Sequence, residues 1–167
     1  VRPTTIPQLY LAPSNVLLSG AESRLSRMDH REFRLKHCLA AVASEFDWCL
    51  IDCSPSLSIL TLNAVAAATD ILIPVQTHYY AIEGLRQMLE TVDIVRERFN
   101  PQLNPARILL TMSEKRTLLS RDVQQQLRDY FKDAVFETVI HRNVRLAETP
   151  SAGQSILTYD KTSTGAI

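Results

Sequence analysis

Asp52 is the residue of this sequence best placed for metal chemistry. It follows the apolar run 48–51, which is typical of a buried parallel strand. Ligands gather at the carboxyl ends of parallel strands, where an Asp can hold Mg²⁺ through water. Helix capping is the alternative, because Ser54, Pro55 and Ser56 predict a helix start and a nearby carboxylate stabilises a helix N-terminus. Position alone leaves both interpretations open.

Three arginines, Arg116, Arg142 and Arg145, form the second set of candidate residues, and Lys115 adds a charge beside the first. Guanidinium groups match phosphate geometry and, when clustered, give a salt-dependent affinity for DNA. The three lie on separate segments, and taken without further information they are better explained as solvated arginines at loop ends. Lys+Arg and Asp+Glu both count 18, and the formal net charge is zero. Any affinity for DNA must therefore come from a local basic patch.

The composition is that of an ordinary globular domain. The 167 residues are 46% hydrophobic and 22% charged, which allows a sizeable core. Cys38, Cys49 and Cys53 lie in apolar segments without metal-ligand spacing, so we expect buried free thiols in a reducing cytoplasm. No apolar run approaches the length of a membrane span and no signal peptide opens the chain, which predicts a soluble cytoplasmic protein.

The elements that must position these residues alternate between strands and helices. Short apolar runs predict strands at 48–51, 71–75, 107–112 and 135–140. Helical patterns cover 15–28, 30–45, 57–68, 81–98 and 119–131, and a short helix is expected over 143–148. This alternation predicts a single α/β domain over 1–167, with a mostly parallel twisted sheet flanked by helices on both faces. Gly is scarce, and the four glycines form no phosphate-binding cluster.

Several segments resemble the ParA/Soj family of partitioning ATPases. The stretch FDWCLIDCSPSLSILTL (46–62) is similar to the family's Walker B and switch II segment. The matches continue in order through LIPVQTHYYAIEGL (72–85), RILLTMSEKRTLLSRDV (107–123) and VFETVIHRNVRLAETPSAGQSILTYD (135–160). The earlier segment IPQLYLAPSNVLLSGAESRL (6–25) also resembles the family. The resemblance covers nearly the whole chain and implies a P-loop NTPase-like fold.

The resemblance implies a deviant Walker ATPase of the MinD/ParA superfamily that acts in chromosome or plasmid partitioning. Such proteins bind ATP and Mg²⁺, form homodimers face to face and then bind DNA without sequence specificity. A centromere-binding, ParB-like partner stimulates their hydrolysis. We therefore expect a cytoplasmic, nucleoid-associated protein that does not bind membranes.

The resemblance also implies roles near the nucleotide. Asp52 matches the Walker B carboxylate, which is catalytic and holds Mg²⁺ through water, and Ser54 and Pro55 belong to switch II. The residues expected near the nucleotide base are Met112, His141, Arg142 and Asn143. Asn143 can instead cap the short helix over 143–148, and both roles are compatible.

The DNA-binding roles implied by the resemblance fall on the arginines. Arg116, in the sequence KRT, and Arg145, in the sequence NVR, match DNA-contacting arginines of the family. Lys115 adds charge beside them, and the assignment of Arg142 to this face is weaker. Ser54 and His141 replace prolines of the family, which affects the details of the switch and base contacts.

The family's Walker A loop, with its two lysines, and its switch I Asp are expected upstream of residue 1. A further helix is expected after residues 165–166. A backbone amide cradle and a lysine supply most phosphate affinity, so this chain alone is expected to bind ATP poorly and to be inactive. Two alternatives stay open: a non-catalytic DNA- or partner-binding module, and a MinD-like positioning ATPase, which needs an amphipathic C-terminal helix.

Overall fold

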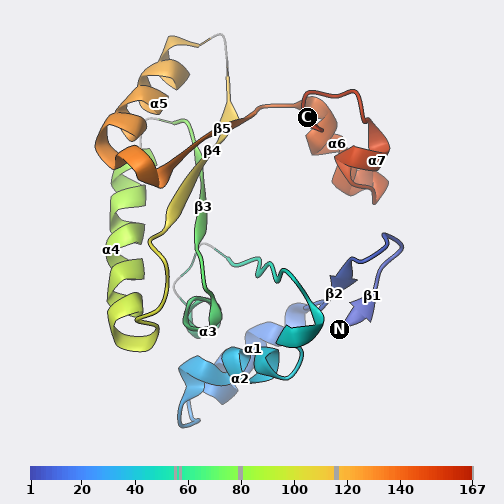
Figure 1. Ribbon diagram of the computed structural model, residues 1–167, viewed down its shortest axis with the longest axis vertical. Coiled ribbons are helices and arrows are strands. Elements are labelled where there is room, and N and C mark those ends of the chain that lie inside the picture. Colours follow the sequence, from blue (N-terminus) through green and yellow to red (C-terminus); the bar gives the residue numbers. More distant parts are fainter. Residues whose placement is uncertain (55, 57, 79–80, 115–116, 167) are drawn as a thin grey trace. The chain divides into compact units, whose positions relative to one another are not determined.

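The computed structural model divides the chain into two compact units, Val1–Ala68 and Thr69–Ile167 (Figure 1). It describes residues 1–54, 56, 58–78, 81–114 and 117–166. Among the predicted site residues, Pro55, Lys115 and Arg116 lie outside the described residues.

Most of the regular secondary structure in the first unit is helical. Its helices are α1 (Ser19–Leu25), α2 (Arg34–Ala40) and α3 (Ile59–Ala67). A short antiparallel ribbon joins β1 (Arg2–Pro3) to β2 (Tyr10–Leu11), and 3₁₀ turns cover Val16–Leu18, Arg31–Phe33 and Ala43–Glu45. The helices observed within 15–28 and 30–45 are therefore shorter than predicted, and 3₁₀ turns take up part of both ranges.

Asn63 organises the helices of this unit. Its side chain is buried on α3, where its Oδ1 accepts a hydrogen bond from the Leu35 N–H at 3.0 Å. Its Nδ2 donates to the carbonyl oxygens of Arg31 and Ile59, both at 2.8 Å. A buried amide must find such partners to offset its desolvation. These bonds join the start of α2 and the preceding turn to α3.

The strand predicted over 48–51 is absent, so that prediction is wrong for this structure. These residues have no regular secondary structure, and Trp48 and Leu50 are 86% and 94% exposed. A strand is held by ladder hydrogen bonds to a neighbour, and none of the described strands pairs with this run. The prediction of buried thiols is also wrong, because the three cysteines, although free, are exposed.

The second unit contains a parallel sheet of three strands. The strands β3 (Leu72–Gln76), β4 (Arg107–Ser113) and β5 (Val135–His141) lie in the order β3-β4-β5. The connections contain α4 (Ala81–Phe99) and α5 (Leu118–Phe131) with the 3₁₀ turn Lys132–Ala134, and α6 (Val144–Ala152) and α7 (Ile156–Tyr159) follow β5. The predicted parallel α/β arrangement is confirmed.

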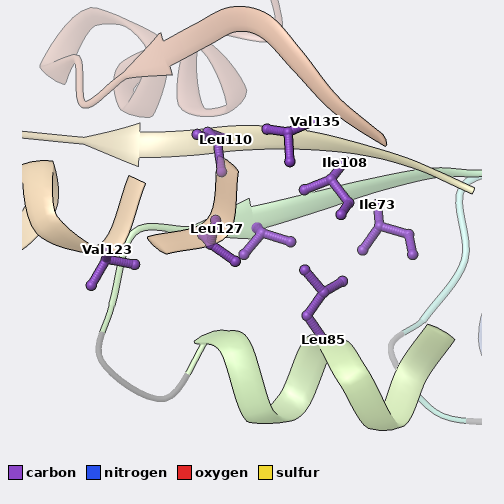
Figure 2. Packing of buried hydrophobic residues seen from close by; sticks show 8 residues of the cluster. Ile73, Leu85, Ile108, Leu110, Val123, Leu127 and Val135 are labelled. Atoms are coloured by element: carbon purple, nitrogen blue, oxygen red, sulfur yellow. The ribbon is translucent and has the colours of Figure 1, made fainter. Parts of the chain in front are cut away.

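The core of this unit lies between the sheet and two helices. Alternate residues of the strands point to one face, among them Ile73, Ile108 and Leu110. Leu85 of α4 and Leu127 of α5 pack against them (Figure 2). The predicted flanking by helices is confirmed, and within this unit α4 and α5 share one face of the sheet. The packing holds the carboxyl ends of β4 and β5 beside each other.

Candidate functional site

The carboxyl ends of β4 and β5 bring the predicted base-contacting residues together. Ser113 pairs with His141 in the parallel register, and the Arg142 N–H donates to the Ser113 carbonyl at 3.1 Å. The register shifts between Leu110 and Ser113, where Met112 has a φ of 49°. Such an irregularity redirects a side chain at a strand end. Met112, 56% exposed, and His141 thus lie on adjacent strand ends.

An ion pair joins the loops that leave these two strands. Arg142 Nη1 lies 2.7 Å from Glu114 Oε1, although the residues are 28 positions apart in sequence. The Arg142 side chain is still 74% exposed. Glu114 immediately precedes Lys115 and Arg116 in the sequence. The pair therefore connects the segment that carries the KRT sequence to the segment that carries the NVR sequence.

A buried polar network holds the start of the loop that follows β4. Ser120 Oγ, near the start of α5, lies 2.8 Å from Thr77 Oγ1 and 3.3 Å from Ser113 Oγ. It also accepts a hydrogen bond from the Glu114 N–H at 3.2 Å. Gln124 Nε2 donates to Ser113 Oγ at 2.9 Å. These hydroxyls satisfy one another in the interior, and they connect the ends of β3 and β4 to α5.

Asn143 caps α6. Its Oδ1 accepts a hydrogen bond from the Leu146 N–H at 3.2 Å, as expected for an N-cap residue. Its Nδ2 donates to Ser163 Oγ and Thr164 Oγ1, both at 3.0 Å. The capping alternative for Asn143 is confirmed. The same side chain ties the segment after α7 to the start of α6.

Arg145 is the centre of an exposed charged cluster on α6 and α7. Its Nη1 lies 2.9 Å from Glu148 Oε2, and its Nε lies 3.7 Å from Asp160 Oδ2. The Tyr159 hydroxyl donates to Glu148 at 3.1 Å. Hydrogen bonds from Arg145 and then from Tyr159 lower the pKa of Glu148. The pKa of Asp160 is lowered mainly by a hydrogen bond from Thr162. The Arg145 side chain stays 56% exposed despite these partners.

In the first unit, Asp52 is exposed and does not cap a helix. The N-cap of α3 is Ser58, whose Oγ accepts from the Leu60 N–H at 3.1 Å. The predicted helix start at residues 54–56 is therefore wrong. Ser54 and Ser56 instead join their hydroxyls at 2.7 Å. Partial burial raises the pKa of the Cys53 thiol, and the Asp52 charge adds to the effect.

The surroundings of Asp52 restrict the kind of metal site it can form. Among the described residues, no three His, Cys, Asp or Glu side chains come close enough to hold a metal together. A single exposed carboxylate does not form a closed protein cage. It does suit Mg²⁺, which keeps most of its waters and is commonly held through one or two carboxylates together with substrate phosphates.

Comparisons with known proteins show the family to which this chain belongs. The family described as "AAA domain" matches residues 1–105. The chain is 47% identical over 165 residues to the chromosome partitioning protein ParA of Myxococcus xanthus, and 46% identical over 166 residues to the sporulation initiation inhibitor protein Soj of Bacillus subtilis. Each match covers 99% of the chain. The chain belongs to the ParA/Soj family of AAA domain proteins.

The chain spans 58% of the length of this ParA relative and 66% of the length of this Soj relative. A solved structure gives the same fold. Cobyrinic acid a,c-diamide synthase from Mycobacterium smegmatis superposes with a TM-score of 0.72 at 34% identity, over 86% of this chain and 63% of that one. It was crystallised with ADP and magnesium, and also with an ATP analogue and magnesium.

Among the described residues of this chain, no helix is long and apolar enough to cross a membrane.

Some residues of this site were not predicted from the sequence. Glu114 follows the strand end directly, but nothing local indicates Arg142 as its partner. The hydroxyls of Ser113 and Ser120 resemble ordinary polar loop and helix residues. Only the pairing of Arg145 with Glu148 had a usable signal, because a spacing of three places two residues side by side on a helix.

Proposed function

We propose that this chain provides the Walker B carboxylate and part of the DNA-binding face of an ATPase that partitions DNA. The observation that carries the proposal is the junction between the segments that follow β4 and β5. Arg142 contacts both the Ser113 carbonyl and the Glu114 carboxylate there. The segment that precedes Lys115 and Arg116 in the sequence is thereby joined to the segment that carries Arg142.

The nucleotide chemistry in this proposal rests on Asp52 and on residues outside the chain. When bound with ATP, magnesium neutralises charge on the phosphates. The Asp52 carboxylate would hold the ion through water, and Ser54 and Pro55 would lie near the terminal phosphate. The Walker A loop with its lysines would come from a segment upstream of residue 1. We accordingly propose that residues 1–167 are one part of a longer ATPase domain and do not hydrolyse ATP alone.

The DNA-binding part of the proposal rests on exposed guanidinium groups. Arg142 and Arg145 lie on either side of Asn143, the cap of α6, and both side chains are more than half exposed. Together with Lys115 and Arg116 they would form a local basic patch in a chain without net charge. Contacts to phosphates would make binding insensitive to base sequence.

ATP-dependent dimerisation would double this patch and so make DNA binding depend on the nucleotide. By its family, the homodimer would associate with the nucleoid in the cytoplasm. A ParB-like protein would stimulate its hydrolysis. The partitioning role is supported at this level by two relatives, the chromosome partitioning protein ParA of Myxococcus xanthus and the chromosome-partitioning ATPase Soj of Treponema pallidum.

The test uses the full-length protein and short random-sequence DNA at several salt concentrations. Arg145→Gln should weaken binding and reduce the slope of log K against log salt by about one per subunit. Gln is preferred to Glu, because a third carboxylate beside Glu148 and Asp160 would disturb α6. Arg86→Gln is the matched control, since Arg86 is also exposed and ion-paired, on α4. DNA binding equal to that of the control would refute the DNA-binding face.

The catalytic half is tested with Asp52→Ala, which should abolish most ATP turnover in the full-length protein by removing the carboxylate that orders the metal. Asp47→Ala is a suitable control, because Asp47 lies five residues earlier in the same segment. Turnover at the wild-type rate in the Asp52 variant would remove Asp52 from the mechanism.

A further inference from the structure

Backbone hydrogen bonds hold both residues of the ion pair between Glu114 and Arg142. The Arg142 backbone is held by the Ser113 carbonyl at 3.1 Å, and the Glu114 backbone by Ser120 Oγ at 3.2 Å. The Thr117 N–H and hydroxyl both donate to the Glu114 carbonyl at 3.3 Å. Both side chains therefore start from fixed positions, and less conformational entropy is lost when they meet.

The negative charge of the Glu114 carboxylate opposes DNA binding. A carboxylate 2.7 Å from a guanidinium group cancels most of its field at the distance of an approaching phosphate. It also occupies one of the N–H groups that a phosphate oxygen would accept from. Since the pair is solvent-exposed, its own stabilisation is small, so a phosphate can displace the carboxylate.

Glu114 has fewer side-chain partners than Glu148, the glutamate that pairs with Arg145. Glu148 also accepts from the Tyr159 hydroxyl and so helps to hold α7 against α6. Among the described residues, the Glu114 carboxylate has only Arg142 as a polar side-chain partner. Removal of its charge therefore changes only the side-chain contact with Arg142.

We propose that Glu114 is an intrinsic brake on DNA binding, which neutralises Arg142 until a DNA phosphate displaces it. This inference rests on the proposed DNA-binding function. It assigns to Arg142 a phosphate contact that is made only at the expense of the ion pair. The brake lowers the affinity of the protein for any DNA and so sets how readily it dissociates and rebinds.

The test is Glu114→Gln in the full-length protein, with ATP and random-sequence DNA. Gln keeps the size and an oxygen acceptor for Arg142 but carries no charge. DNA affinity should rise about fivefold, the factor for one unit charge at contact distance in water. The slope of log K against log salt should steepen by about 0.9 per subunit, because one more phosphate is neutralised. Glu90→Gln is the matched control, since Glu90 pairs with Arg86 on α4 and its removal changes the net charge equally.

Two results would overturn the brake. One is a Glu114→Gln protein that binds DNA no more tightly than the Glu90→Gln control. The other is a gain that persists in full in an Arg142→Gln background, where the brake has no arginine to release. The Arg145→Gln measurement separates this inference from the proposed function. If Arg145→Gln weakens binding while Glu114→Gln does not strengthen it, only the brake is wrong.

Discussion

Ser120→Ala should destabilise the second unit, because it removes a buried hydroxyl from the centre of the polar network around Thr77 and Ser113. The Ser120 hydroxyl is 3% exposed and lies 2.8 Å from the buried Thr77 hydroxyl. Its loss leaves Thr77 and the Glu114 N–H without this partner. Ser113 keeps its bond to Gln124. An unsatisfied buried hydroxyl costs about 1–3 kcal/mol, and the partly exposed Glu114 amide can turn to water. We expect a loss of about 1–3 kcal/mol.

Thr77→Val on its own should cost a similar amount, since it leaves Ser120 without the same bond. The double variant should cost about 1 kcal/mol less than the sum of the two, because neither hydroxyl then remains unsatisfied. Ser151→Ala is the control, since Ser151 is exposed on α6, and it should change stability by no more than about 0.5 kcal/mol.

Hydrogen exchange of the β4 amides measures this effect, because Ile108 and Leu110 are fully buried and exchange when the unit opens. Because β4 belongs to the second unit, its amides report the stability of that unit. If Ser120→Ala leaves their protection unchanged, or if the two single losses add in full, the hydroxyls do not share a hydrogen bond that matters to stability.

Two further predictions concern α6. Asn143→Ala should lower the protection of the α6 amides by about 1–2 kcal/mol through loss of the cap. Asn143→Asp should keep the cap, and the Ser163 and Thr164 hydroxyls can then donate to its second carboxylate oxygen. Equal exchange in both variants would contradict this. Glu148 should titrate below the ordinary glutamate pKa of about 4.3, so its stabilisation of α6 and α7 is present above that pH and is lost as the pH falls through the lowered pKa. Carboxyl chemical shifts measure this pKa, which Arg145→Gln should return toward its ordinary value; a Glu148 that is unaffected by that change would contradict the assignment.

The sequence determined most of the second unit. Apolar runs and helical periodicity place strands and helices over 71–75, 81–98, 107–112, 119–131 and 135–140, within a few residues of the observed elements. Each of these patterns is local, since it depends on which side chains share one face of a strand or helix. The ParA/Soj family was also recognisable, because its motifs are long contiguous strings. The cap at Asn143 is equally local, as it needs only the residues that follow it.

The tertiary structure decided which distant groups meet. Arg142 is paired with Glu114 across 28 positions, and Ser120 with Thr77 across 43, only because parallel strands bring their carboxyl ends to one edge of the sheet. The run 48–51 shows the converse. Its apolar composition favours a buried strand, yet in the described structure it has no ladder partner and Trp48 and Leu50 stay exposed. Composition sets what a segment prefers, but a strand and an ion pair both need a second segment to supply the other half of the interaction.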